Sequence, residues 1–274
     1  MSSGDGYNRR FADILAHITR LVRCVDDSLL HDDKANIEKH WWRVIEFLEV
    51  AGNGGVADKF QFSEETGEFA GFRITKDTVE PLPKYLDAIR EYPIPKTTTD
   101  IRSWFGLVNQ VSHYAQLRSY MEPFKKFLSP KTKFEWNSEL DSLFANSKEL
   151  IVEAIKEGVR IFDPTRRTAL MSDWSKTGIG FWLLQKHCKC PKQSPGCCQD
   201  GWRITLAGSR FLSSAERNYA PVEGEALSVA WALEQTRYFT MGCNDLLVVV
   251  DHKPLIKLLG DRRLDEIANP SSAH

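Results

Sequence analysis

Three acidic residues in the last third of the chain combine the residue type and the placement that divalent-cation chemistry needs. Asp173 ends an apolar run, Glu225 lies in the first turns of an expected helix, and Asp251 ends a second apolar run. Carboxylates that converge on one rim of a sheet can bind two Mg²⁺ or Mn²⁺ ions. Such ions activate a water molecule and stabilise the leaving oxygen in phosphodiester cleavage. The alternative is that each acid is an ordinary helix cap or turn residue.

A pair of adjacent acids near the start of the chain offers similar chemistry. Asp26 and Asp27 lie between two short apolar runs, residues 21–25 and 28–31. This pattern predicts a β-hairpin with the acids at its tip. Two carboxylates there could hold a cation, although an Asp-Asp pair is also common in plain turns.

Four of the six cysteines crowd into eleven residues. The cluster comprises Cys188, Cys190, Cys197 and Cys198, and His187 precedes it. These side chains supply enough ligands for a structural zinc ion, although their gaps are shorter than those of common zinc sites. The alternative is a surface insertion with incidental thiols. Because the first residues lack a secretory apolar core, we expect reduced thiols and an intracellular protein.

The elements around these residues follow from hydrophobic periodicity and turn signals. The first 80 residues predict an α+β unit whose helix spans 34–51, with Ile37, Trp41 and Leu48 on its apolar face. A second hairpin is expected with Phe60 and Phe62 in its first strand and a Glu-Thr-Gly turn. The middle of the chain is predicted to be helical, with Thr98 or Thr99 capping one helix and Asn137 another.

The last stretch predicts a mixed α/β sheet. Strands are expected at 167–173, 178–186, 202–210 and 246–250, with a helix over 221–239 and a last helix over 254–259. Ala226, Leu227, Ala230 and Leu233 suggest the buried face of the longer helix.

Composition limits the remaining choices. The 274 residues suit two domains, 42% are hydrophobic, and the formal net charge is −1. Any nucleic-acid surface must therefore be a local patch. The sequence has no apolar run long enough to span a membrane, so we expect no membrane partner. Trp41, Trp42, Trp104 and Phe105 could stack on bases, but their helical spacing favours core packing.

Several ordered blocks resemble the Pol polyprotein of gypsy-like long-terminal-repeat retrotransposons. They are CVDDSLLHDD (24–33), EFAGF (68–72), the segment 88–114, and SDWSKTGIGFWL (172–183), with further matches at 208–233 and 248–255. The resemblance implies a partial reverse transcriptase palm (1–80), a helical thumb with connecting helices (81–158), and a ribonuclease H-like, mixed five-stranded domain (159–274).

The resemblance also implies roles for the acids. Asp26 and Asp27 would be palm carboxylates for nucleotidyl transfer, with Cys24 in the place of the motif's tyrosine. Asp173, Glu225 and Asp251 would be ribonuclease H metal ligands, with Glu225 matching the motif better than Glu223. The implied partners are RNA–DNA hybrid, primer–template, deoxynucleotides and the missing parts of the polyprotein.

The chain departs from the family pattern at both ends. A further palm aspartate should lie on an earlier strand, and a fourth ribonuclease H acid should follow the last helix; neither has a match. We therefore expect a C-terminally truncated fragment that cannot polymerise alone and cleaves hybrids weakly. Trp174, where family members often carry Ala, could crowd the metal site or pack on the sheet. The rival hypothesis is a non-catalytic remnant that binds nucleic acid weakly at most.

Overall fold

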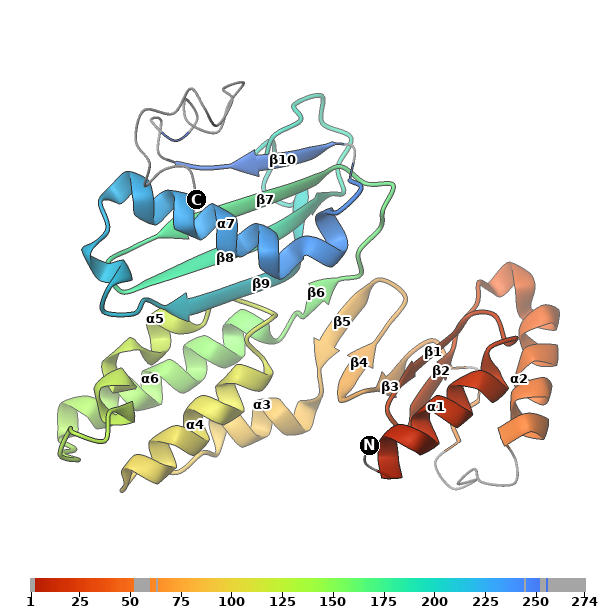
Figure 1. The fold of residues 1–274 in the computed structure, drawn as a ribbon, viewed down its shortest axis with the longest axis horizontal. Helices are drawn as coiled ribbons and strands as arrows, with labels where there is room; N and C mark the ends of the chain where they lie inside the picture. Colours follow the sequence, from red (N-terminus) through yellow and green to blue (C-terminus); the bar gives the residue numbers. More distant parts are fainter. Residues whose placement is uncertain (1–2, 52–59, 63, 244, 252–254, 256–274) are drawn as a thin grey trace. The chain divides into compact units, whose positions relative to one another are not determined.

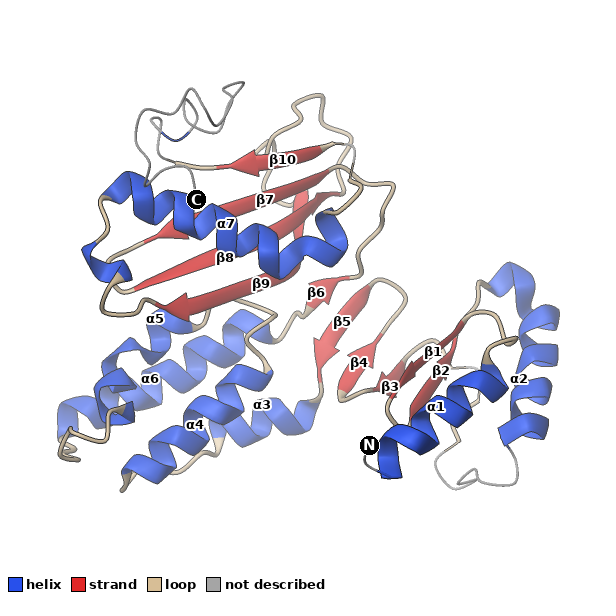
Figure 2. Cartoon of the chain, in the orientation of Figure 1, coloured by secondary structure: helices blue, strands red, loops and turns tan. Residues whose placement is uncertain are grey.

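The chain forms two compact units, Met1–Lys76 and Asp77–His274. The structure is a computed structural model that describes residues 3–51, 60–62, 64–243, 245–251 and 255 (Figures 1 and 2). The helices described there include none that is long and apolar enough to cross a bilayer. The mixed α/β fold class is confirmed, whereas the three-part division at residues 80 and 158 stays a prediction.

The first unit contains the expected acidic hairpin. Strand β1 (Leu21–Cys24) pairs antiparallel with β2 (Asp27–Leu30), and Cys24 lies opposite Asp27. Val25 and Asp26 are left as a two-residue turn, and Val25 has φ of 55°. A β-branched residue in this left-handed region is strained, so the turn holds the acids at the tip at a conformational cost.

Two helices accompany this hairpin. Helix α1 (Ser3–Leu15) was not predicted, whereas α2 (Ile37–Ala51) covers most of the expected 34–51 span and follows the short helix η1 (Lys34–Asn36). The Asp32 carboxylate, whose side chain is almost fully buried, forms ion pairs with Arg20 and Arg43. This network ties the end of β2 to α2.

The expected apolar face of α2 is largely exposed. Trp41 is 50% exposed and Trp42 66%, so the prediction that they pack in the core is wrong for both, whereas Trp104 is fully buried. Trp41 instead makes an edge contact with Phe62, with ring centroids 4.8 Å apart. The spacing of apolar residues identified this face of α2 but could not show whether other residues cover it.

The second hairpin lies further along the chain than expected. Its strands are β3 (Gly67–Phe69) and β4 (Phe72–Ile74), and the described residues 60–62 form no strand. The turn is Ala70–Gly71, whose φ values are 51° and 83°. Two consecutive positive φ values are typical of a type I′ turn, which matches strand twist better than the Glu-Thr-Gly turn we predicted.

The second unit begins with helices whose caps are explicit. They are α3 (Pro83–Arg90), α4 (Thr98–Gln110), α5 (Arg118–Met121), η3 (Glu122–Leu128) and α6 (Ser138–Ile155). Thr97 caps α4 through a capping box with Asp100, so the prediction of Thr98 or Thr99 is wrong by one residue. Asn137 caps α6 as predicted, accepting from the Leu140 N–H at 2.9 Å. Trp104, Phe124 and Phe144 pack at the centre of these helices.

The strands of the second unit form the expected mixed sheet. Short strands β5 (Thr78–Pro81) and β6 (Val159–Arg160) pair antiparallel beside it. The main sheet has the order β10-β7-β8-β9, comprising β7 (Thr168–Trp174), β8 (Gly178–Lys186), β9 (Trp202–Phe211) and β10 (Leu246–Val249). Only the β10–β7 pair is parallel. The described residues thus give this sheet four strands where five were expected.

Helix α7 (Pro221–Thr240) crosses one face of this sheet and follows the short helix η4 (Glu216–Asn218) (Figure 1). A core of Leu170, Phe181, Leu183 and Ala232 lies between helix and sheet. The predicted buried stripe is wrong, since Ala230 and Leu233 are exposed. The buried residues are Gly224, Glu225, Ser228, Val229, Ala232 and Thr236. The last helix predicted over 254–259 lies outside the described residues except Leu255.

Gly224 sets how closely α7 approaches the sheet. A Cβ at this position would lie 2.3–2.5 Å from three atoms of the Trp174 indole ring. Trp174 therefore packs against helix α7, which a side chain at residue 224 would push away.

We expect Gly224→Ala to lower the melting temperature, because overpacking costs about 1–3 kcal/mol and exceeds the gain in helix propensity. Gly106→Ala is the matched control, since a Cβ there meets nothing within 4 Å. It should stabilise the protein by up to about 1 kcal/mol. Thermal melts with Trp fluorescence measure both. Equal shifts of the same sign would contradict the packing argument.

Candidate active site

The structure brings Asp173, Glu225 and Asp251 together. A carboxylate oxygen from each lies within 4.8 Å of one from the other two. Strand register explains part of this: parallel pairing sets Met171 opposite Val249, so Asp173 and Asp251, each two residues further on, reach the same edge of the sheet. Helix α7 supplies Glu225 from its second turn.

The burial of Glu225 gives this group its electrostatic character. Glu225 is 6% exposed, and its Oε2 atom is buried without a hydrogen-bond partner among the described residues. Burial, followed by the charges of Asp251 and Asp173, raises the pKa of Glu225 to about 7. Burial and the charge of Asp251 also raise the pKa of Asp173. Ion pairs formed by described residues include no cation for any of the three, so a bound cation would relieve their repulsion.

Neighbouring side chains fix the helix that carries Glu225. The Ser228 hydroxyl donates to the Ser172 hydroxyl at 3.2 Å, which ties α7 to β7 inside the core. Glu223 accepts from the Ala220 N–H at 3.1 Å and so caps the helix. Glu223 is outside the acid group, whereas Glu225 is part of it.

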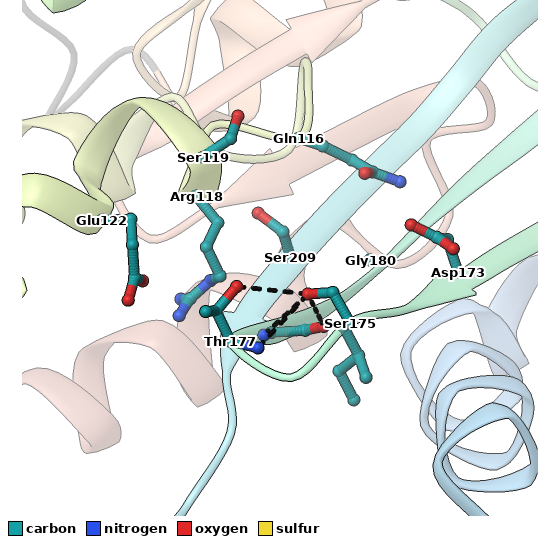
Figure 3. A pocket seen from close by; sticks show the side chains of 11 residues that line it. Gln116, Arg118, Ser119, Glu122, Asp173, Ser175, Thr177, Gly180 and Ser209 are labelled. Carbon is teal, nitrogen blue, oxygen red and sulfur yellow. Dashed lines mark hydrogen bonds between the residues drawn. The ribbon is translucent and has the colours of Figure 1, made fainter. Parts of the chain in front are cut away.

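A small pocket of about 140 Å³ adjoins Asp173 (Figure 3). Gln116, Arg118 and Ser119 line one side, and Ser175 and Thr177 line the other. The Ser175 hydroxyl lies 3.2 Å from that of Thr177. The pocket therefore combines hydroxyl groups, an amide, a guanidinium and the Glu122 carboxylate beside the candidate metal ligands.

Arg118 is the cationic member of this pocket. Its Nε and Nη1 atoms are buried without hydrogen-bond partners among the described residues, and the guanidinium lies 3.2 Å from the centre of the Phe211 ring. Burial lowers the pKa of Arg118 to about 9. Two of the guanidinium donors therefore have no partner within the described part of the chain.

Sequence reasoning did not identify Gln116 or Arg118. Their approach to β8 depends on Gly178 and Gly180, since a Cβ at each position would lie 2.6 Å from the Arg118 and Gln116 side chains respectively. Glycines inside a strand can indicate such a close approach. The Gly-Ile-Gly segment was thus the only sequence signal for this pocket.

Asp26 and Asp27 lie at the hairpin tip in the first unit and are both exposed. Asp27 accepts through Oδ2 from the Ala70 N–H at 3.0 Å, so the tip of one hairpin contacts the turn of the other. The described residues place no third potential ligand with them. The metal-binding role predicted for the pair stays a prediction.

The four clustered cysteines also meet in space. Their sulfur atoms lie within 4.8 Å of one another, whereas His187 is outside the group. His187 instead donates its backbone N–H to the Gly201 carbonyl at 2.8 Å. The backbone N–H of Cys190 lowers the pKa of the Cys188 thiol to about 7. The structure therefore brings together four of the five residues predicted as a soft-metal site.

Comparison with known proteins relates the acid group to a family. Residues 163–270 match the family described as "RNase H-like domain found in reverse transcriptase". This region is an RNase H-like domain of reverse transcriptase. The homologues of the chain are Pol polyproteins of retrotransposons, which confirms the family recognised from the sequence. All three acids lie within the matched residues.

Two homologues illustrate the extent of the similarity. The Pol polyprotein of transposon gypsy from Drosophila melanogaster is 27% identical over 253 residues, which cover 87% of this chain and 23% of the polyprotein. The transposon Tf2-3 polyprotein from Schizosaccharomyces pombe is 23% identical, over 87% of this chain and 17% of the polyprotein. The chain thus spans a quarter or less of these two curated relatives.

Solved structures show the same fold. The foamy viral protease-reverse transcriptase in complex with an RNA/DNA hybrid matches with a TM-score of 0.73 and 15% identity, over 94% of this chain and 34% of that one. The dRH form in complex with double-stranded DNA has the same TM-score and 17% identity, over 99% of this chain and 46% of that one. Both units of the chain thus have counterparts in one reverse transcriptase.

The raised pKa of Glu225 predicts how metal-free protein responds to pH. The pKa of Glu225 in the folded protein is about 7, above the ordinary value of 4.5. The protonated side chain therefore adds fully to the free energy of unfolding below about pH 4.5, and this contribution is lost as pH rises through 7. Melting temperatures in EDTA should therefore fall over this range more for wild type than for Glu225→Gln. Millimolar Mg²⁺ should raise the wild-type value at pH 8 by mass action.

Glu223→Gln is the control for this measurement, because it changes a neighbouring acid on the same helix and leaves Glu225 intact. It should retain the wild-type dependence on pH and Mg²⁺. A wild-type pH profile that Glu225→Gln leaves unaltered would show that Glu225 is not the titrating group.

Proposed function

We propose that the RNase H-like domain hydrolyses the RNA strand of RNA–DNA hybrids with Mg²⁺ or Mn²⁺. The observation that carries this proposal is the meeting of Asp173, Glu225 and Asp251 without a cationic partner in the described part of the chain. Hard divalent cations bind carboxylate oxygens of this kind. A bound cation would supply an activated water and charge stabilisation at the leaving oxygen.

The residues of this chain perform the other tasks. Asp173, Glu225 and Asp251 would hold the cation, with the sheet and α7 positioning the three carboxylates. Ser172 and Ser228 orient Glu225 by joining those elements inside the core. The acid group lies at the sheet edge, where Asp173 and Asp251 are both exposed and a polymeric substrate has access.

The pocket beside Asp173 suits a phosphate of the same substrate. Arg118 offers a guanidinium, Ser175 and Thr177 offer hydroxyl groups, and the charge of Arg118 faces the Glu122 carboxylate in the same pocket. Phosphate contacts position a nucleic acid without reading its sequence. A-form-like duplexes are recognised mainly through their backbone and 2′-hydroxyl groups. The foamy viral relative, solved in complex with an RNA/DNA hybrid, supports this substrate class.

Asp26 and Asp27 are the second candidate site, for RNA-directed DNA synthesis on a primer–template with deoxynucleotides. The favouring observation is that Asp26 in the two-residue turn and Asp27 at the start of β2 are both exposed. The Ala70 N–H contact to Asp27 adds a fixed neighbour. Primer extension by the wild-type chain that is lost in the Asp26→Asn and Asp27→Asn variants would support this activity. If the wild-type chain extends no primer, the RNase H-like domain is favoured as the only working site.

We expect Asp173→Asn to reduce Mg²⁺-dependent hybrid cleavage by more than about 100-fold. Mutating a residue that only supports a metal ligand costs about 10–100-fold, and loss of the ligand itself should cost more. Asp87→Asn, an exposed acid on α3, is the control and should retain wild-type activity. The assay follows a labelled RNA strand in a hybrid. If wild type and Asp173→Asn were equally active, the cleavage would come from a contaminant; if neither were active, the chain would be a non-catalytic remnant.

Arg118→Met should weaken hybrid binding by about tenfold or more, since a charge-assisted hydrogen bond contributes roughly 1.5–3 kcal/mol. Met keeps an apolar chain against Phe211 and removes the charge. The slope of log affinity against log salt should fall by about 1, as expected for one lost phosphate contact. Arg102→Ala, an exposed position on α4, is the control. An unchanged salt slope in Arg118→Met would exclude a phosphate contact.

A further inference from the structure

The connection between β8 and β9 is long and has no regular secondary structure. It runs over residues 187–201. Loops of this length without helix or strand are uncommon in compact domains unless they have a function or a constraint of their own. Its four cysteines are the feature that could supply that constraint.

The sulfur atoms have the spacing of a tetrahedral metal site. Cys188 Sγ lies 3.4 Å from Cys197 Sγ, and Cys197 Sγ lies 3.9 Å from Cys198 Sγ. Four sulfurs around zinc at about 2.3 Å lie about 3.8 Å from one another, which falls within this range. A disulfide needs about 2.05 Å, so these sulfurs are too far apart to be bonded.

The cysteine cluster lies directly beside Gly201, where a larger residue would clash with the sulfur atoms. A Cβ at Gly201 would lie 2.5 Å from Cys198 Sγ, 2.7 Å from Cys188 Sγ and 3.0 Å from Cys197 Sγ. Three of the four sulfurs therefore occupy the space that a side chain at residue 201 would need. The His187 N–H donates to the Gly201 carbonyl, and this hydrogen bond joins the two ends of the loop.

Three lysines lie in or beside the loop that carries the cluster. Lys186 donates through Nζ to the Cys190 carbonyl and, at 3.0 Å, to Gln193 Oε1. Lys189 and Lys192 are exposed in the same loop. A zinc ion bound by four thiolates has a net charge of −2, and the loop also carries the exposed Asp200.

The loop also lies against the sheet. Cys198 and Gln199 line a pocket of about 620 Å³ together with Met171 and Val249. A cluster that closes the loop would hold this segment over β7 and β10. Closing a long loop reduces its conformational entropy, which is how a structural metal stabilises a fold.

We propose that Cys188, Cys190, Cys197 and Cys198 bind one structural zinc ion that holds the β8–β9 connection. The site is separate from the acid group and takes a soft metal through sulfur. It does not depend on the nuclease activity proposed above.

The first test measures metal in the full wild-type chain. Protein expressed with added zinc and purified without chelators should contain about one zinc ion per chain, as a four-coordinate site requires. After replacement by Co²⁺, the protein should show the intense visible bands of a tetrahedral cobalt–thiolate centre. A zinc content below about one tenth of an equivalent would overturn the proposal, because a structural site retains its metal.

Variants then locate the site. The double variant Cys188→Ser/Cys197→Ser should lose zinc, whereas Cys24→Ser and Cys243→Ser, both outside the cluster, should retain it. Gly201→Ala keeps all four thiols and should lower zinc affinity by roughly tenfold or more in competition with a chromophoric chelator. Zinc retained by the double variant, or a wild-type mass showing two fewer hydrogens from a disulfide, would contradict the assignment.

Discussion

Repulsion among three carboxylates is the constraint on which the second unit depends. Asp173 lies in β7, Glu225 lies in α7, and Asp251 follows β10 by two residues. Leaving Glu225 buried without a hydrogen-bond partner for Oε2 costs stability. A fold that keeps this arrangement gains from a cation and not from the acids themselves.

The helix that carries Glu225 shows how the remaining packing accommodates that constraint. Its buried face includes two hydroxyl residues, Ser228 and Thr236, which bond within the helix or to Ser172. Gly224 lets Trp174 pack closely beside the acid. Small and hydroxyl residues allow α7 to approach the sheet and set the depth at which Glu225 enters the site.

The strands of the main sheet and the Asn137 cap were predictable from sequence because local signals determine them. The alternation and apolar runs of β7, β8, β9 and β10 and the Asn137 cap depend on neighbouring residues alone. The buried face of α7 was not predictable, since a face with Glu, Ser and Thr has the polarity of a solvent face. The second hairpin was misplaced because Ala70–Gly71 lacks the Asn or Asp that usually identifies a type I′ turn.

The acid group was predictable by resemblance, whereas the pocket beside it was not. A sequence motif identifies side chains, whereas Gly178 and Gly180 matter because they have none. Their lack of a side chain allows Arg118 and Gln116 to approach β8. Gly201 does the same for the sulfur cluster. Within one unit, oxygen ligands at the sheet edge suit hard cations and sulfur ligands in the loop suit soft ones. The donor sets of the two proposed sites therefore favour different classes of metal ion.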